Sequence, residues 1–183
     1  MVYLAGNSVL LDVNYILRKA GIGEEMRVAA LGCGASGHFV FPSAELVGKG
    51  GLVYAVDILK PVLENIKRRA KLENYENIET VWSNLEIFNA TKIESGSLDV
   101  DFLINTMYQS HKRGEMMREA ARLLKKDGRL LIVEWKNIAS PFGPPPSERV
   151  DINQVKAVGK KLGLNIQAEF EAGQFHYGVL FSK

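Results

Sequence analysis

The sequence predicts an α/β protein in which helices cover both faces of a doubly wound, mainly parallel sheet. Short apolar runs typical of buried strands alternate with segments in which apolar residues recur at helical spacing. A cluster of glycines follows the first apolar run, as at many strand-to-helix turns. Two strand-like segments at the end of the sequence are separated by a short turn, which adds one antiparallel strand to the sheet.

The first half of the sequence alternates helix and strand. Gly48 follows one helical segment and Pro61 opens the next, as expected at a helix end and in a first helical turn. The predicted elements are a helix from Val13 to Ala20, a strand over 28–31, a helix over 38–47, a strand over 52–56, a helix from Pro61 to Lys71 and a strand over 78–82.

The second half continues the alternation and ends in a hairpin. Four of the six prolines lie in residues 140–147, which predicts a stiff loop. The predicted elements are a strand over 98–104, a helix through Met116 and Leu123 that stops at Asp127-Gly128, a strand over 129–135, a helix from Ile152 to Leu162, and strands over 164–170 and 175–181 around a turn at Ala172-Gly173.

The composition is that of an ordinary globular protein. Of 183 residues, 46% are hydrophobic and 24% are charged, and Cys33 is the single cysteine. A chain of this length buries enough surface to fold without a disulfide or a structural metal. We expect one domain over residues 1–183, with residues 1–27 as an N-terminal helical cap, in a reducing cytoplasmic setting.

The charge balance favours neither a membrane nor a nucleic acid as partner. The formal charge is +2, from 23 basic and 21 acidic side chains. No apolar run approaches the length of about 18 residues that a membrane span requires. The basic runs over 67–71 and 122–129 lie mostly on outward helix faces, so solvated surface explains them, although RNA stays an open alternative. We expect a monomer or a homodimer that acts on a small molecule.

The glycine turn, residues 32–37, lies where a doubly wound sheet binds ligands, beyond the carboxyl ends of its strands. Asp57 ends the second strand, where a carboxylate can accept both hydroxyl hydrogens of a ribose. Together they indicate a cofactor that contains a nucleoside. Because the spacing of Gly32, Gly34 and Gly37 also fits the pattern of NAD-binding proteins, the glycines alone do not identify that cofactor.

A wider resemblance identifies it. Residues 28–58 (VAALGCGASGHFVFPSAELVGKGGLVYAVDI), 97–109 (SLDVDFLINTMYQ) and 119–135 (EAARLLKKDGRLLIVEW) resemble the class I methyltransferases that use S-adenosylmethionine. The chain is most similar to the small domains related to the ubiquinone and menaquinone biosynthesis methyltransferases. The resemblance implies a Rossmann-like sheet in the order 3-2-1-4-5-7-6, with S-adenosylmethionine as cofactor and S-adenosylhomocysteine as product.

The resemblance also implies roles for particular residues. Gly32 and Gly34 would lie under the methionine and ribose, Asp57 on the ribose hydroxyls and Ile58 beside the adenine. Further residues predicted to bind the cofactor are Cys33 and Gly37 in the turn, Ser83 and Asn84 near the adenine amino group, and Asn105 facing the methionine end and the acceptor.

Methyl transfer requires positioning more than covalent chemistry, because the sulfonium methyl is already activated. A general base, if the reaction uses one, should follow the fourth or fifth strand, where His111, Tyr108 and Glu134 lie. His111 is the first choice, although a helix-start histidine can also be solvated, and Glu134 can instead orient the acceptor. His38 is expected only to pack. The three histidines and Cys33 lack metal-ligand spacing, so no metal is expected.

Aromatic residues and the proline loop are predicted to surround the acceptor. Trp135 and Phe142 flank the loop over 140–147 and would form an apolar wall. If the loop covers the site, its prolines lower the entropy that is lost on ordering.

Three classes of function are compatible with the sequence. The first is a methyltransferase that acts on a small molecule. The second is a catalytically silent cofactor-binding or interaction protein, because Ala30 stands where the family usually has an acid and Ser36 where it usually has a glycine. The third is an NAD-binding oxidoreductase, which would normally need a further catalytic domain.

Overall fold

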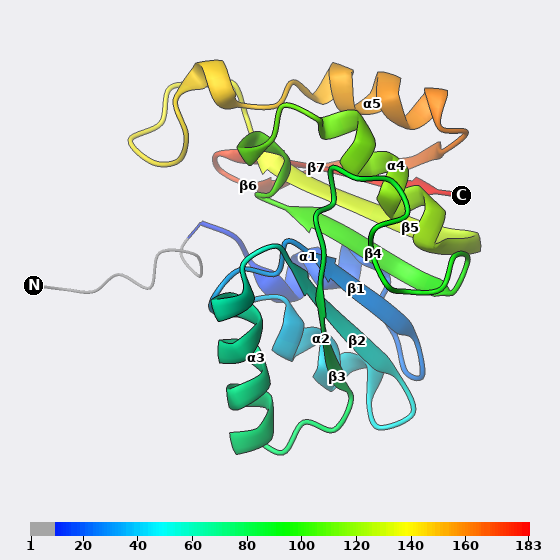
Figure 1. Cartoon of the computed structure of the whole chain (residues 1–183). Coiled ribbons are helices and arrows are strands. Elements are labelled where there is room, and N and C mark those ends of the chain that lie inside the picture. Colours follow the sequence, from blue (N-terminus) through cyan, green and yellow to red (C-terminus); the bar gives the residue numbers. More distant parts are fainter. Residues whose placement is uncertain (1–9) are drawn as a thin grey trace, which may run out of the picture.

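The chain folds around a seven-stranded sheet in the order β3-β2-β1-β4-β5-β7-β6, in a computed structural model that describes residues 10–183. Only β7 runs antiparallel to its neighbours (Figure 1). This confirms the predicted fold class and strand order. The strands are β1 (Arg27–Leu31), β2 (Leu52–Asp57), β3 (Ile78–Trp82), β4 (Leu98–Ile104), β5 (Leu124–Trp135), β6 (Asn165–Gly173) and β7 (His176–Ser182).

Helices cover both faces of the sheet because both faces are apolar. Along β1, Val28 and Ala30 join one core cluster, whereas Ala29 and Leu31 join the other. The helices α1 (Val13–Ala20), α2 (Val40–Val47) and α3 (Lys60–Leu72) cover the first face, and α4 (Arg113–Leu123) and α5 (Ile152–Lys161) cover the second (Figure 1). Two short 3₁₀ helices, η1 (Met107–Gln109) and η2 (Pro146–Glu148), follow β4 and the proline loop.

Local sequence signals set several helix ends. Asp12 and Asp151 cap α1 and α5 by accepting hydrogen bonds from backbone N–H groups of the first turn. Gly21 ends α1 in the left-handed conformation, with φ of 68°. Pro61 lies in the first turn of α3, as predicted.

The observed elements differ from the predicted ones at three places. The strand β5 begins at Leu124, earlier than predicted. Residues Asp127-Gly128, where the preceding helix was expected to stop, lie inside this strand. The pairing of β5 with β4 is irregular in this part and shifts between Leu98 and Val100. The hairpin turn lies at residues 174–175, after β6 has continued through Gly173. The helix α2 starts two residues later than expected, at Val40.

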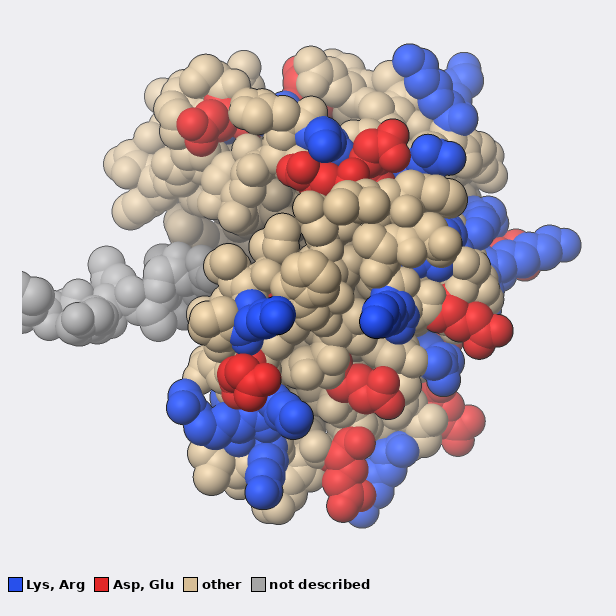
Figure 2. All heavy atoms as spheres, viewed as in Figure 1, with Lys and Arg blue, Asp and Glu red and all other residues tan. Residues whose placement is uncertain are grey.

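Two arginines in the second predicted basic run are structural rather than solvated. Arg122 is bonded to the buried Glu119, and Arg129 donates to the backbone oxygen of Gly21 at 2.9 Å. The first run, over 67–71, is exposed on α3 apart from Ala70. Figure 2 shows that Lys and Arg are interspersed with Asp and Glu on this face of the molecule.

The proline loop projects beyond the end of β5 (Figure 1) and is held by one arginine. Arg149, 8% exposed, donates hydrogen bonds to backbone oxygens of Lys136, Ile138 and Pro144. Gly143 packs against the ring of Trp135. The loop therefore takes its conformation from contacts with its own backbone and with the end of β5.

The predicted N-terminal cap is described in part. It contains α1, whereas residues 1–9 lie outside the described residues. In the part of the chain that the structure describes, no helix has the length and apolar character needed to cross a membrane.

Candidate functional site

Asp57 ties the glycine turn to the end of β2. Its carboxylate accepts hydrogen bonds from the backbone N–H groups of Gly34 at 3.1 Å and Leu59 at 3.0 Å. Asp57 is 8% exposed, so these bonds fix its position. The end of β2 and the turn after β1 are thereby held as one unit.

The glycines of the turn have different tasks. Gly32 and Gly34 adopt φ of 79° and 66°, which disfavours side chains. A Cβ on Gly32 would overlap Thr106, whereas one on Gly34 would meet open space. Gly37 packs closely against Phe41 and lines neither of the two cavities that the rest of the turn borders. The turn is therefore open for a ligand at Gly34.

A cavity of about 460 Å³, here named the Asp57 cavity, lies beyond the carboxyl ends of β1, β2 and β3. Ile58 and Leu59 form an apolar and half-exposed rim at 51% and 58% exposure. The residues that line it are Gly32, Gly34, Ala35, Asp57, Ile58, Leu59, Val62, Ser83, Asn84, Leu85, Glu86, Thr106, Gln109, Ser110 and Met116.

Ser83 and Asn84 line this cavity, but each is also engaged within its own loop. The Ser83 hydroxyl is 2.9 Å from that of Thr91, and Oδ1 of Asn84 accepts from the backbone N–H of Glu86 at 2.9 Å. Ser83 is 1% exposed. The Asn84 amide nitrogen is the better placed of the two for a ligand, because the Ser83 side chain is enclosed.

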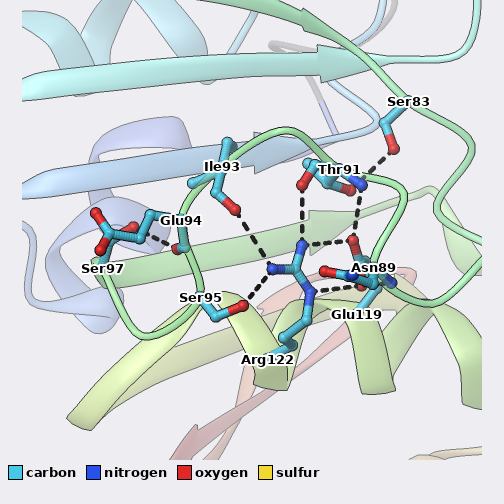
Figure 3. Close-up of polar contacts among 9 residues, drawn as sticks. All are labelled: Ser83, Asn89, Thr91, Ile93, Glu94, Ser95, Ser97, Glu119 and Arg122. Atoms are coloured by element: carbon cyan, nitrogen blue, oxygen red, sulfur yellow. Dashed lines mark hydrogen bonds and ion pairs between the residues drawn. The ribbon is translucent and has the colours of Figure 1, made fainter.

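A buried ion pair under the loop between β3 and β4 holds that loop on α4 (Figure 3). Glu119 is fully buried and accepts from Asn89, Thr91 and Arg122. The Arg122 guanidinium also donates to the backbone of Thr91 and Ile93 and to the hydroxyl of Ser95. Burial alone would raise the pKa of Glu119, but its hydrogen bonds outweigh burial and lower the pKa to about 2.

A second cavity of about 460 Å³, here named the His38 cavity, lies beyond the carboxyl ends of β1, β4 and β5. It shares Gly32, Gly34, Ala35 and Gln109 with the Asp57 cavity. Among the described residues, 10–183, no Asp, Glu, Lys or Arg lines it. Its lining residues are Leu11, Ala30, Leu31, Gly32, Cys33, Gly34, Ala35, Ser36, His38, Phe39, Phe102, Ile104, Asn105, Tyr108, Gln109 and Trp135.

Polar atoms of the His38 cavity lack partners. Nε2 of His38 and Oδ1 of Asn105 are buried without a hydrogen bond in the described structure. Burial lowers the pKa of His38, so its imidazole is neutral at pH 7 and can accept a proton. The His38 ring packs edge-on against Phe39 as the sequence indicated, but the residue also faces this cavity.

The three residues predicted as candidate bases occupy different surroundings. Tyr108 lines the His38 cavity, and burial raises its pKa. Glu134 lies beneath η1, where its Oε1 accepts from the backbone N–H of Met107 at 2.6 Å. His111 is exposed and lines neither cavity.

Most of the remaining predicted residues line the His38 cavity. Cys33 and Asn105 line the His38 cavity, and burial raises the pKa of the Cys33 thiol to about 12. Trp135 lines it as well, whereas Phe142 is 50% exposed and the proline loop contributes no lining residue. In residues 10–183, no group of three His, Cys, Asp or Glu side chains is arranged to hold a metal.

Sequence reasoning missed the residues contributed by η1 and by the loop before β4. Thr106 and Gln109 line the Asp57 cavity with Leu85 and Glu86. The polar segment that follows β4 directly was the signal that could have indicated Thr106 and Gln109. A hollow of about 540 Å³ beside Lys67 and Lys71 lies elsewhere, against the outer edge of β3.

Comparison with known proteins assigns the family. Residues 22–174 match the model of a methyltransferase domain family. The chain belongs to this family. This confirms the resemblance found in the sequence: the domain is that of an S-adenosylmethionine-dependent methyltransferase, and S-adenosylmethionine is its cofactor.

Individual relatives differ in function. A demethylmenaquinone methyltransferase from Lactococcus lactis is 27% identical over 144 residues, which make up 79% of this chain and 56% of that protein. The chain thus spans little more than half the length of this methyltransferase relative. A SAM-dependent methyltransferase from Aquifex aeolicus has the same fold, with a TM-score of 0.85, 24% identity and coverage of 94% of this chain and 90% of that one. The [4+2]-cyclase SpnF also shares the fold, with a TM-score of 0.78, 9% identity and coverage of 93% and 79%.

The residues of the methyltransferase domain fit this cofactor. The Asp57 carboxylate faces a cavity and, beside its two backbone hydrogen bonds, has lone pairs left that can accept from ribose hydroxyls. Ile58 and Leu59 offer apolar surface to a purine. The open space at Gly34 leaves room at the shared wall of the two cavities. Ala30 lines the His38 cavity, so no carboxylate is available at that position for the amino group of the methionine portion.

Proposed function

We propose that this methyltransferase moves a methyl group from S-adenosylmethionine to a small-molecule acceptor in the His38 cavity, by in-line displacement. The observation that carries the proposal is that the two cavities share Gly32, Gly34, Ala35 and Gln109. A ligand in the Asp57 cavity and a ligand in the His38 cavity would therefore meet at the glycine turn.

The chain's own residues would bind and orient the reactants. When bound, the cofactor supplies a methyl carbon activated by a positively charged sulfur. Asp57 would accept the ribose hydroxyls, and Asn84 would contact the adenine edge. Phe39, Phe102 and Trp135 would exclude water, and positioning of this kind contributes roughly 7 to 11 kcal/mol to lowering a barrier.

A small molecule suits the His38 cavity better than a macromolecule does. Among residues 10–183, no charged residue lines the cavity, and its walls combine apolar side chains such as Phe39 with polar ones such as Asn105 and Gln109. On the face seen in Figure 2, exposed Lys and Arg are interspersed with Asp and Glu, which favours nucleic acid less than a continuous basic surface would. We propose a cytoplasmic protein of one domain, monomeric or dimeric, in keeping with the lone Cys33.

Proton transfer, where the acceptor requires it, is assigned to His38. Its Nε2 is unpartnered, its imidazole is neutral and it lines the acceptor cavity. Tyr108 would orient the acceptor through its hydroxyl, because a raised pKa makes it a poor base near pH 7. His111 takes no part, since it is exposed outside both cavities.

Calorimetric titration with S-adenosylmethionine, S-adenosylhomocysteine and NAD tests the cofactor site. We expect the first two to bind and Asp57→Ala to weaken binding about 100-fold, because a carboxylate that accepts two hydrogen bonds is lost. Glu64→Ala, which removes an exposed carboxylate on α3, is the matched control.

The same titration separates the alternatives. Binding of S-adenosylhomocysteine without methyl transfer to any acceptor in a screen would indicate a catalytically silent relative, for which Ala30 and the fold shared with a cyclase are the specific reasons. Binding of NAD in place of both would contradict the proposal and favour the oxidoreductase reading.

A further inference from the structure

Glu134 is a buried carboxyl group under the short helix η1. It lies near the end of β5 at 0% exposure. Oε1 accepts from the backbone N–H of Met107 at 2.6 Å, and the N–H groups of Thr106 and Tyr108 also interact with the carboxyl group. Oε2 is buried without a partner. The side chain thus satisfies the amino end of η1 and leaves one of its own oxygens free.

Residues in and next to η1 line both cavities. Gln109 lines both, and Tyr108 lines the His38 cavity. Thr106, just before η1, lines the Asp57 cavity and is the residue that closely approaches Gly32. A displacement of η1 would therefore change the shape of both cavities at once.

Glu134 is one of several groups that hold the amino end of η1. The Thr106 hydroxyl donates to the backbone oxygen of Leu31 at 3.2 Å, and the backbone N–H of Asn105 donates to that of Val133 at 2.9 Å. A 3₁₀ helix of three residues has weak internal hydrogen bonding, and its first N–H groups have no partner within the helix. Arg113 holds the other end, by donating to the backbone oxygens of Met107 and Ser110. Of the groups that hold the amino end, Glu134 is the ionisable one and the acceptor for the Met107 N–H.

The surroundings of Glu134 disfavour its ionised form. Tyr108 on η1 and Tyr177 on β7 interact electrostatically with it, and raised pKa values keep both phenols neutral near pH 7. Arg113 on α4, Glu148 on η2 and Asp151 before α5 are the other charged groups that act on these tyrosines. No cation bonds to Glu134, and burial raises its pKa to about 7 despite the lowering effect of the backbone N–H groups.

We propose that Glu134 is a positioning residue whose neutral form holds η1 against the end of β5, and that its ionisation favours release of η1. An ionised carboxylate gains hydration when η1 lifts and water enters, whereas the neutral group gains little. Release of η1 therefore becomes easier as the pH rises through the pKa of Glu134. The inference rests on the proposed function only for the ligand used as probe.

Amide hydrogen exchange of Met107 in the ligand-free protein tests the proposal. After correction for intrinsic exchange, protection of this amide in the natural protein should fall about tenfold between about pH 6 and about pH 8. Glu134→Gln, which is neutral at every pH, should retain protection over the whole range. Asp101→Asn is the control, because Asp101 is a fully buried carboxyl group of β4 that donates and accepts no hydrogen bond with η1.

Titration with S-adenosylhomocysteine gives an independent measurement. Glu134→Ala removes the acceptor for Met107 and should weaken binding about tenfold, whereas Glu134→Gln should bind within about twofold of the natural protein. Rescue by Gln separates positioning from a requirement for charge.

The outcomes distinguish this proposal from the proposed function. Two outcomes would overturn the role of Glu134. In the first, the protection of the Met107 amide is equal in all three proteins. In the second, this protection falls with pH as steeply in Glu134→Gln as in the natural protein. Failure of S-adenosylhomocysteine to bind any variant would count against the proposed function alone, and the exchange measurement would still decide the role of Glu134.

Discussion

Glu119 and Glu134 are both fully buried, and each supports one side of the site, but their surroundings are opposite. Glu119 lies under the loop of the Asp57 cavity, where Arg122 and two backbone N–H groups bond its two oxygens (Figure 3). Glu134 lies under η1 at the joint wall with the His38 cavity, has no cation partner and keeps Oε2 unpartnered. The pKa is lowered to about 2 in Glu119 and raised to about 7 in Glu134.

The difference shows how one protein can hold one segment beside its cavities firmly and leave another adjustable. A carboxylate with all its partners makes the surrounding loop rigid, because every displacement would leave a buried charge without compensation. A carboxyl group with an unpartnered oxygen makes the adjoining segment sensitive to protons and to entering water. The loop between β3 and β4 is of the first kind and η1 of the second.

The largest effect on stability is expected from Arg122→Ala. Removal of the guanidinium would leave Glu119 as a buried, unpaired charge, so the free energy of unfolding should fall by about 3 to 5 kcal/mol in urea denaturation. Arg118→Ala, which breaks the exposed pair with Glu115, should cost less than about 1 kcal/mol. Equal losses in the two variants would show that the buried pair does not hold the loop.

A pH-dependent effect of nearly the same size is expected for Glu134. Because its pKa is raised from 4.5 to about 7 in the folded state, the unfolded chain loses the proton first as the pH rises. The natural protein should therefore lose about 3 kcal/mol of stability relative to Glu134→Gln between pH 4.5 and about 7, and nothing more above it. A difference in unfolding free energy that stays constant with pH would contradict this.

The unpartnered Nε2 of His38, in the His38 cavity, leads to a kinetic prediction. With an acceptor that must lose a proton, His38→Ala should lower kcat about 100-fold, the usual contribution of a general base. Binding of S-adenosylhomocysteine, measured by calorimetry, should be little changed. His111→Ala is the matched control, and a loss of activity there with none in His38→Ala would restore the assignment made from the sequence.

The smallest of these effects is expected from Glu119→Gln. The variant keeps the shape of the side chain but weakens the hydrogen bonds from Arg122, at a cost of about 2 kcal/mol near neutral pH. Since the pKa of Glu119 is lowered to about 2, this cost should shrink as the pH falls below 4.5 and vanish near pH 2. Urea titrations at several pH values would measure it, and a cost that grows in acid would contradict the assignment.

The features that the sequence predicted are those that local signals along the chain determine. The alternation of helices and strands and the turn at Gly32 and Gly34 could be predicted because apolar periodicity and glycine spacing are local signals, whereas the strand order was implied by the resemblance to class I methyltransferases. The place of His38 in the His38 cavity could not be predicted, because His38 and the other lining residues, such as Trp135, come from separate parts of the chain that the folded sheet brings to one cavity. The start of β5 at Leu124 was missed since its pairing across an irregularity depends on β4.

The proline loop after β5 has a consequence for altering this protein. Arg149 holds the loop through carbonyl groups, which every amino acid carries, so the loop's path depends little on which side chains stand at residues 137–142. Side chains there can be exchanged, alone or in libraries, without unfolding the segment. Because no residue of the loop lines the His38 cavity, such exchanges would reach that cavity only through Gly143, which packs on its wall residue Trp135.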